Sequence, residues 1–343
     1  MNGIRRLVHP GLLAGAVLLT LMLVVHHAVI LTALGVELPA GWWFVDTYAL
    51  LASSDAVAQG LDPYVPNPLD ILHVPHWYSD WWFALAALGF NRTDVFAVGA
   101  FIVGSFLVTA LVSLRPSRGG EVAGAWLVLC SPPVLLGVNR ANADLLVCAL
   151  MVLLAWILAA APRRIWAAGG VALVALATGL KFYPIVAGAA LVAAPRPRRE
   201  RWLALGLMAL AALLVAWSVA DAVVRALPLV LPPVGFFSFG AGAWFGLLGL
   251  TPPAAHLAAW VTGLALAAFW WRLAPAVPAG IAPHERIAFV IGALLIVGCF
   301  FTGVSYSYRL VFVVLLLPLL WRWVALGPAT EGRWIVRLVL GLM

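Results

Sequence analysis

The chain has 343 residues, of which 65% are hydrophobic and 10% are charged, and its formal net charge is +7. Soluble domains contain roughly 45–50% apolar and about 25% charged residues, so this composition excludes an ordinary soluble domain. The basic residues gather at the ends of apolar stretches, and no basic run is interleaved with aromatic residues. The positive charge therefore indicates orientation in a membrane and argues against nucleic-acid binding.

Roughly ten apolar stretches are candidates for transmembrane helices, which need about 20 predominantly apolar residues. The first follows Arg5 and Arg6 without a convincing cleavage site, so we interpret it as a signal anchor. The sequence predicts an all-α polytopic membrane protein that forms one domain over residues 1–343. The predicted spans are residues 11–35, 94–114, 121–138, 143–161, 165–180, 182–195, 202–224, 254–271, 287–305 and 310–326.

The basic residues also predict how the chain is oriented. If the N-terminus is cytoplasmic, most arginines between the spans fall on the cytoplasmic side, as the positive-inside rule expects. The abundance of alanine and the use of Arg in place of Lys are typical of a GC-rich bacterial genome, which suggests the bacterial inner membrane. The basic residues expected on the opposite, extracytoplasmic side are Arg92, Arg140, Lys181, Arg225 and Arg309.

Residues 36–92 form the long first extracytoplasmic loop, and loops of this length are usually functional. The loop is rich in tryptophan, which is typical both of an interfacial aromatic belt and of a surface on which sugar rings stack. The sequence leaves both interpretations open. The tryptophans are Trp42, Trp43, Trp77, Trp81 and Trp82.

Within this loop, residues 47–59 are predicted to form an interfacial helix. Asp46 suits either the N-cap of that helix or a functional carboxylate, while Gly60 suits its C-terminal cap. Asp55 points away from Asp46 at 100° per residue, so the two carboxylates are not expected to share a site. Asp55 and Asp62 are expected to be solvated.

A polar segment between two predicted spans contains Asn139, Arg140, Asn142 and Asp144. Polar side chains at membrane depth are costly unless they are paired or hydrated, so this segment is a candidate for function. Because Arg140 and Asp144 are four residues apart, their spacing also suits an ion pair along one helix. An internal salt bridge and a ligand-binding role both remain open.

Two further cationic positions lie on the predicted outer side. Lys181 lies at a predicted sharp reversal between two short apolar stretches, where it either faces a cavity or snorkels to the surface. Arg309 follows Tyr306 and Tyr308 between the last two predicted spans, and an arginine beside two tyrosines suits an anion with an aromatic or apolar neighbour. A tyrosine belt with an isolated arginine is the alternative.

No cofactor is expected from the motifs. The sequence has no spacing typical of a metal site, no nucleotide-binding glycine motif and no nucleophile elbow. The cysteines fall inside apolar stretches and are expected to be small core residues.

The remaining combination suits transfer of a sugar from a lipid phosphate to a hydroxyl. A phosphate leaves as a stable anion, so it needs cations such as Lys181 and Arg309 and no general acid. One carboxylate, Asp46, is then sufficient as the base for the acceptor hydroxyl, and in-line attack inverts the anomeric centre. A glycoside hydrolase, in contrast, uses two carboxylates.

At these residues the chain resembles the polyprenol-phosphate-mannose-dependent mannosyltransferases of glycosyltransferase family 87, in the GT-C superfamily. An early Asp with Tyr nearby and Gly-x-x-Pro-Tyr, a Lys-x-x-Pro and a late Tyr-Arg carry the resemblance, although Val138 replaces a glutamine of the family pattern. The matching residues are Asp46, Tyr48, Gly60, Pro63, Tyr64, Gly137, Asn139, Arg140, Asn142, Asp144, Lys181, Pro184, Tyr308 and Arg309.

The resemblance implies a GT-C-like bundle, a polyprenyl-phosphate sugar donor, most simply mannose, and Asp46 as the catalytic base. Lys181, Tyr308 and Arg309 are expected to bind the donor phosphate. A glycolipid or glycan would be the acceptor. Residues expected to contact the sugar or the acceptor are Tyr48, Tyr64, His76, Trp77, Asn139, Arg140, Asn142 and Asp144.

Two other functions remain open from the sequence. A transporter or flippase of lipid-linked glycans would need a central polar pathway and usually an internal repeat, and neither is found in the sequence. A non-catalytic membrane scaffold is the second alternative.

Overall fold

The computed structural model of the chain describes residues 9–33, 43–226, 229, 238–273, 280–301 and 305–326. Arg5, Arg6 and Trp42 lie outside these residues. The α-helices are α1 (Pro10–Ala33), α2 (Val45–Ala58), α3 (Ala84–Ala87), α4 (Val95–Leu114), α5 (Gly119–Leu129), α6 (Pro132–Arg140), α7 (Ala143–Ala160), α8 (Arg163–Lys181), α9 (Arg198–Ala226), α10 (Ala241–Leu247), α11 (Pro252–Leu273), α12 (Pro283–Phe301) and α13 (Leu317–Leu326).

Among the described residues, four further segments are 3₁₀ helices, and two residue pairs form a short antiparallel strand pairing. In that pairing Ser238 lies opposite Tyr306, and Phe239 lies opposite Ser305. The 3₁₀ helices are η2 (Asp80–Phe83), η3 (Arg92–Asp94), η4 (Tyr183–Ala193) and η7 (Ser307–Leu315). The strands are β1 (Ser238–Phe239) and β2 (Ser305–Tyr306).

The chain is a multi-pass membrane protein. Within the described residues, 4 helices are long and apolar enough to cross a membrane, namely α4 with its preceding turn, α7, α9 and α12. The number rises to 6 if each of two bent helix pairs is one span. A helix lies within every predicted stretch, but α8 and η4 belong to the shorter apolar class. The expected total of roughly ten spans therefore stays a prediction.

Two predicted spans are bent instead of continuous. The stretch 121–138 is divided into α5 and α6, which meet at 55°, and the stretch 310–326 is divided into η7 and α13, which meet at 49°. Both breaks lie beside proline, at Pro132 and at Pro318. Proline lacks the backbone N–H that an uninterrupted helix needs, which explains why the helix restarts there.

The predicted reversal after Lys181 is present. Helix α8 ends at Lys181, Phe182 adopts a φ of 32°, and η4 starts at Tyr183 and packs back against α8. A positive φ is uncommon for a residue with a side chain, so tertiary contacts must hold Phe182 in this conformation. The reversal leaves Lys181 at the tip of a helical hairpin.

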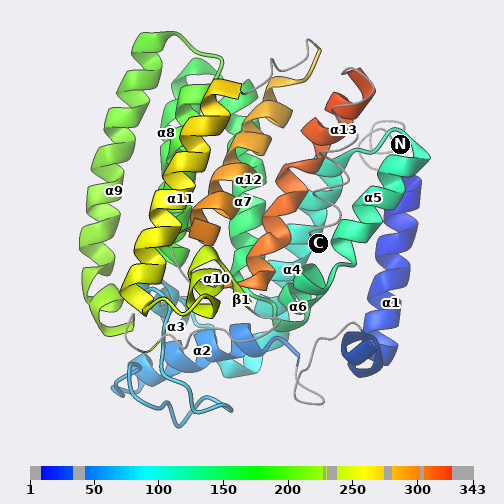
Figure 1. Cartoon of the computed structure of the whole chain (residues 1–343). Coiled ribbons are helices and arrows are strands. Elements are labelled where there is room, and N and C mark those ends of the chain that lie inside the picture. Colours follow the sequence, from blue (N-terminus) through cyan, green and yellow to red (C-terminus); the bar gives the residue numbers. More distant parts are fainter. Residues whose placement is uncertain are drawn as a thin grey trace.

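Helix α7 lies at the centre of the bundle, with α4, α8 and α12 packed against it (Figure 1). Its Leu145, Met151 and Leu154 are fully buried in the main hydrophobic core. Helix α9 lies at the periphery, where Trp217 is 86% exposed. An exposed apolar face of this kind on a spanning helix is what contact with lipid requires.

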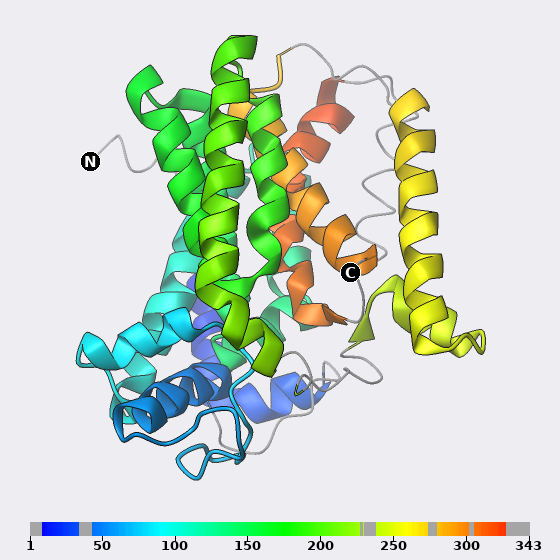
Figure 2. The ribbon, with the colours of Figure 1, turned by 90° about the vertical axis from the view of Figure 1, so that its left-hand side faces the viewer.

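The loop helices α2 and α3 lie across one end of the bundle, as the two perpendicular views show (Figures 1 and 2). Trp82 Nε1 donates to the carbonyl of Leu180 at 3.0 Å, and Trp81 Nε1 donates to Ser218 Oγ at 3.1 Å. These two tryptophans therefore fasten the loop to α8 and α9. We call this end of the bundle the loop face.

The expectation that two loop carboxylates are solvated is wrong for Asp55 and holds only in part for Asp62. Arg92 Nε lies 2.9 Å from Asp55, whose side chain is 13% exposed. Asp62 is half-exposed, but Arg225 lies 2.6 Å from it. Both arginines are distant in sequence from their partners, so no local pattern indicates either pair.

Candidate active site

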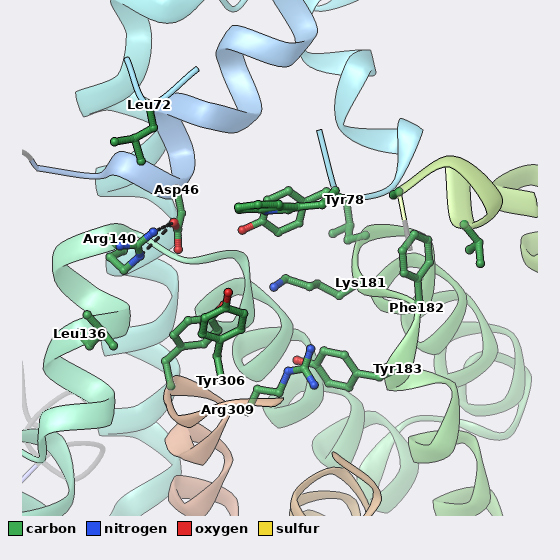
Figure 3. A pocket seen from close by; sticks show the side chains of 15 residues that line it. Asp46, Leu72, Tyr78, Leu136, Arg140, Lys181, Phe182, Tyr183, Tyr306 and Arg309 are labelled. Carbon is green, nitrogen blue, oxygen red and sulfur yellow. Dashed lines mark hydrogen bonds and ion pairs between the residues drawn. The ribbon is translucent and has the colours of Figure 1, made fainter. Parts of the chain in front are cut away.

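A cavity of about 440 Å³ opens at the loop face, between the loop and the ends of the bundle helices. This volume lies within the range of small-molecule sites, roughly 300–1,000 Å³. Figure 3 shows that the labelled side chains point into one shared space. The polar and aromatic residues that line it are Asp46, Trp77, Tyr78, Arg140, Lys181, Phe182, Tyr183, Tyr306, Tyr308 and Arg309.

Asp46 lies in the first turn of α2 and is 7% exposed. Its Oδ1 accepts hydrogen bonds from Arg140 Nε at 3.0 Å and Nη2 at 2.6 Å, and its Oδ2 accepts one from Asn142 Nδ2 at 2.5 Å. The N-cap alternative is wrong, because Phe44 occupies that position. The carboxylate is therefore held by tertiary contacts and aimed at the cavity (Figure 3).

The predicted pairing of Arg140 with Asp144 along one helix is also wrong. Helix α6 ends at Arg140, and Ala141 follows with a φ of 43°. Asn142 then caps α7 by accepting from the backbone N–H of Asp144 at 2.9 Å. Because the chain turns between the two charged residues, Arg140 faces Asp46 while Asp144 faces the interior.

Lys181 is buried instead of reaching the surface, with 9% of its side chain exposed. Its Nζ lies 3.2 Å from Asp144 Oδ1, and the same oxygen accepts from the hydroxyl of Tyr183 at 2.7 Å. The ammonium also lies 4.8 Å from the ring centre of Tyr78 and 5.8 Å from that of Tyr308. The snorkelling alternative is therefore wrong.

The ring of Tyr183 lies beside the second cation, Arg309, and two further tyrosines of the cavity stack on each other. The Arg309 guanidinium lies 4.7 Å from the ring centre of Tyr183. The rings of Tyr306 and Tyr308 stack with 5.2 Å between their centres and 4° between their planes.

Tyr78, which also lines the cavity, is protonated at neutral pH. Burial, and then the neighbouring Asp46 carboxylate, raise the pKa of Tyr78 well above its usual value. Its phenol therefore stays protonated and able to donate a hydrogen bond at neutral pH.

The charges that line the cavity do not balance. Asp46 is the one carboxylate among its described lining residues, whereas Arg140, Lys181 and Arg309 are cations. The second acid nearby, Asp144, is fully buried behind Lys181. Desolvated cations in excess over acids favour an anionic ligand.

Some residues predicted for the site lie away from the cavity. The hydroxyl of Tyr48 donates to the carbonyl of Leu69 at 3.3 Å. The hydroxyl of Tyr64 donates to Asp80, and its ring lies under Arg225, with 4.2 Å between the guanidinium and the ring centre. Both tyrosines therefore stabilise the loop around the cavity and do not line it.

Three other predicted residues are buried behind the cavity wall. His76 is 2% exposed, and its Nε2 lies 3.3 Å from the carbonyl of Ser79. Asn139 is 1% exposed, and its backbone carbonyl accepts from the N–H of Phe44 at 2.8 Å. Asn142 is not among the residues that line the cavity; its side chain donates a hydrogen bond to Asp46, which lines it. Among the sugar and acceptor candidates, Trp77 and Arg140 line the cavity.

Three tyrosines that line the cavity were not among the predicted site residues: Tyr78, Tyr183 and Tyr306. Each is one or two residues from a position that was singled out, at Trp77, Lys181 and Tyr308 respectively. Their proximity in sequence was the available signal. Proximity in sequence does not indicate the direction in which each ring points.

The described residues contain no group of three or more His, Cys, Asp and Glu side chains that could hold a metal ion. Cys130, Cys148 and Cys299, all within the described residues, form no disulfide. Comparison with protein-family models, curated proteins and solved structures found no match to the chain. The fold and the cavity thus define a multi-pass helical membrane protein with a cationic, tyrosine-lined site, and its function must be argued from that site.

Proposed function

We propose that the protein is an inverting glycosyltransferase that moves a sugar from a polyprenyl-phosphate donor to a hydroxyl of a glycolipid or glycan acceptor. The observation that carries this proposal is the unequal charge of the cavity, in which Asp46 faces the cations Arg140, Lys181 and Arg309. One base and several cations are what transfer from a phosphate leaving group requires.

Lys181 and Arg309 are the groups proposed to bind the donor phosphate. As the bond between the anomeric carbon and the phosphate oxygen breaks, negative charge grows on that oxygen. Cations fixed in a site with little water stabilise this charge without reorganising. Asp144 and Tyr183 hold the ammonium of Lys181 in place through one shared oxygen.

Asp46 is the proposed base. It takes the proton of the acceptor hydroxyl as that oxygen attacks the anomeric carbon from the side opposite the phosphate, which inverts the configuration. Each carboxylate oxygen has more than one acceptor site, so the hydrogen bonds from Arg140 and Asn142 leave capacity for the substrate. These two residues orient the carboxylate.

The lipid nature of the donor is supported by the apolar part of the cavity wall, which contains Leu72, Leu180, Val223 and Ala226. Val223 and Ala226 belong to α9, the helix whose outer face is exposed. A GT-C-like bundle of roughly ten spans in a bacterial inner membrane, with a cytoplasmic N-terminus and mannose as the sugar, completes the proposal. These finer features come from the orientation of the charges and from the family resemblance.

The test is transfer of radiolabelled mannose from a polyprenyl phosphate to a glycolipid by the purified protein. Asp46→Asn is expected to reduce the rate about 10²–10⁴-fold, the usual contribution of a general base. Asp55→Asn is the matched control, because Asp55 lies on the same helix and also pairs with an arginine, but outside the cavity. Its rate is expected to match the wild type.

Equal transfer by wild type and Asp46→Asn would overturn Asp46 as the base. Absence of transfer from every polyprenyl-phosphate sugar tested would overturn the enzyme proposal. Movement of a fluorescent lipid-linked glycan across the bilayer of reconstituted vesicles would then identify the transporter alternative.

A further inference from the structure

A second cavity, of about 480 Å³, lies among Arg115, Arg118, His284, Glu285 and Arg322. Arg115 follows the end of α4, and His284 and Glu285 belong to the first turn of α12. Helix α4 starts at the loop face and has 20 residues, so its two ends are about 30 Å apart. The second cavity is therefore on the face opposite the loop, the predicted cytoplasmic face.

The charges of this cavity are again predominantly positive. Three arginines and one glutamate are among the residues that line it. Arg322 Nε lies 3.5 Å from Glu285 Oε1, so this carboxylate already has a cationic partner. Within the described part of the chain, no carboxylate lies within ion-pair distance of the guanidinium of Arg115 or Arg118, although Glu121 Oε2 accepts from the backbone N–H of Arg118 at 3.3 Å.

The geometry around Arg115 fixes one of these charges in the cavity wall. Its Nε donates to the carbonyl of Val112 at 2.9 Å, and its guanidinium lies 4.8 Å from the ring centre of Trp156. The same indole stacks on His284, with 4.0 Å between ring centres and 18° between planes. Arg115 is therefore held rigid, with further N–H groups left for a ligand, whereas Arg118 is exposed at the rim.

We propose that this cavity binds a phosphate group, and that the headgroup of an anionic phospholipid supplies it. Arginine suits this ligand because its planar guanidinium matches the oxygens of a phosphate. The position at the ends of spanning helices places the site level with lipid headgroups, and basic pockets between such helices are established sites for anionic lipids. This proposal does not depend on the proposed function.

The test is retention of lipid by the full-length protein, purified in detergent and measured by native mass spectrometry. Phosphatidylglycerol is expected to remain bound and phosphatidylcholine is not. Because each arginine near a lipid surface contributes about 1 kcal/mol, R115Q/R118Q is expected to weaken phosphatidylglycerol binding about thirtyfold. R198Q/R199Q is the matched control, because it removes the same charge from exposed positions at the start of α9.

Single R118Q, at the exposed rim, keeps the test meaningful if loss of Arg115 disturbs folding, and it is expected to weaken binding about fivefold. Equal binding in wild type and R118Q, or equal loss in R198Q/R199Q, would overturn the site. Inorganic phosphate at millimolar concentration is expected to leave lipid binding unchanged. Full displacement by it would overturn the lipid as the source of the phosphate.

Discussion

Asp46 and Arg140 are separated by 94 residues, yet they form two hydrogen bonds, the shorter at 2.6 Å. Arg140 ends α6, and Asp46 lies in the first turn of α2, so this contact joins the loop to the bundle. Both N–H groups of Arg140 donate to Asp46 Oδ1, and Asn142 Nδ2 donates to Oδ2, so the two residues together fix the position and the tilt of the carboxylate. Arg140 is therefore a positioning residue for Asp46.

Arg140→Lys is expected to lower the transfer rate about 10²-fold, because lysine keeps the charge but not the planar fork, and small misplacements of a reacting group have effects of this size. The KM for the lipid donor is expected to change little. The measurement is a comparison of kcat and KM with those of the wild type. A change confined to KM would contradict a positioning role and would assign Arg140 to donor binding.

Lys181 and Asp144 form a buried ion pair, with 3.2 Å between Nζ and Oδ1. The effects of substituting the two residues on the free energy of unfolding should therefore not be additive. Removing one partner leaves a buried charge uncompensated, so Lys181→Met and Asp144→Asn are each expected to destabilise the fold by about 3–5 kcal/mol. The double variant is expected to lose much less than the sum of the two. Thermal unfolding in detergent measures all three.

The control for this cycle is the half-exposed pair of Arg225 and Asp62. Asp62→Asn is expected to change stability by about 1 kcal/mol or less, because water screens the pair. Additive effects of Lys181→Met and Asp144→Asn would show that the two residues do not interact in the folded protein.

Hydropathy and basic-residue asymmetry predicted the helical membrane class and the stretches in which helices lie, because a span is a local property of about 20 residues. They did not predict the bends beside Pro132 and Pro318, where a short break is averaged over a long apolar window. The reversal at Lys181 was predictable, since a charge and a proline interrupt the apolar pattern there.

The predicted site contained Asp46, Lys181 and Arg309, which do line one cavity. Its pairings were less accurate, because Asp144 was assigned to Arg140 by spacing alone and instead pairs with Lys181. Helical spacing applies only when both residues share a helix, and the turn at Ala141 separates them. Contacts between distant segments depend on tertiary packing, which no local pattern records.

Buried His76 makes the loop sensitive to acid. Burial lowers its pKa from 6.5 to about 4, so the folded loop holds it neutral. The unfolded loop binds a proton more readily between these values, so stability falls as the pH falls from about 6.5 towards about 4 and then levels off. Hydrogen exchange of the loop amides across this range measures the effect.

His76→Gln is expected to remove this pH dependence, while His73→Gln, at an exposed position of the same loop, is expected to retain it. Burial raises the pKa of Asp70, which acts in the opposite sense on acidification, so the difference between wild type and His76→Gln isolates the histidine. The same pH profile in both would contradict the assignment.

Gly179 is required where the loop packs on α8. A Cβ atom there would lie 2.2 Å from the Trp81 ring, so Gly179→Ala must displace the tryptophan and its hydrogen bond to Ser218. We expect destabilisation by about 1–3 kcal/mol and faster proteolysis of the loop. Gly206→Ala is the control, because a Cβ there meets no atom within 4 Å apart from the neighbouring backbone of its own helix, and alanine favours the helix. A thermal midpoint raised equally by both substitutions would contradict the close contact with Trp81.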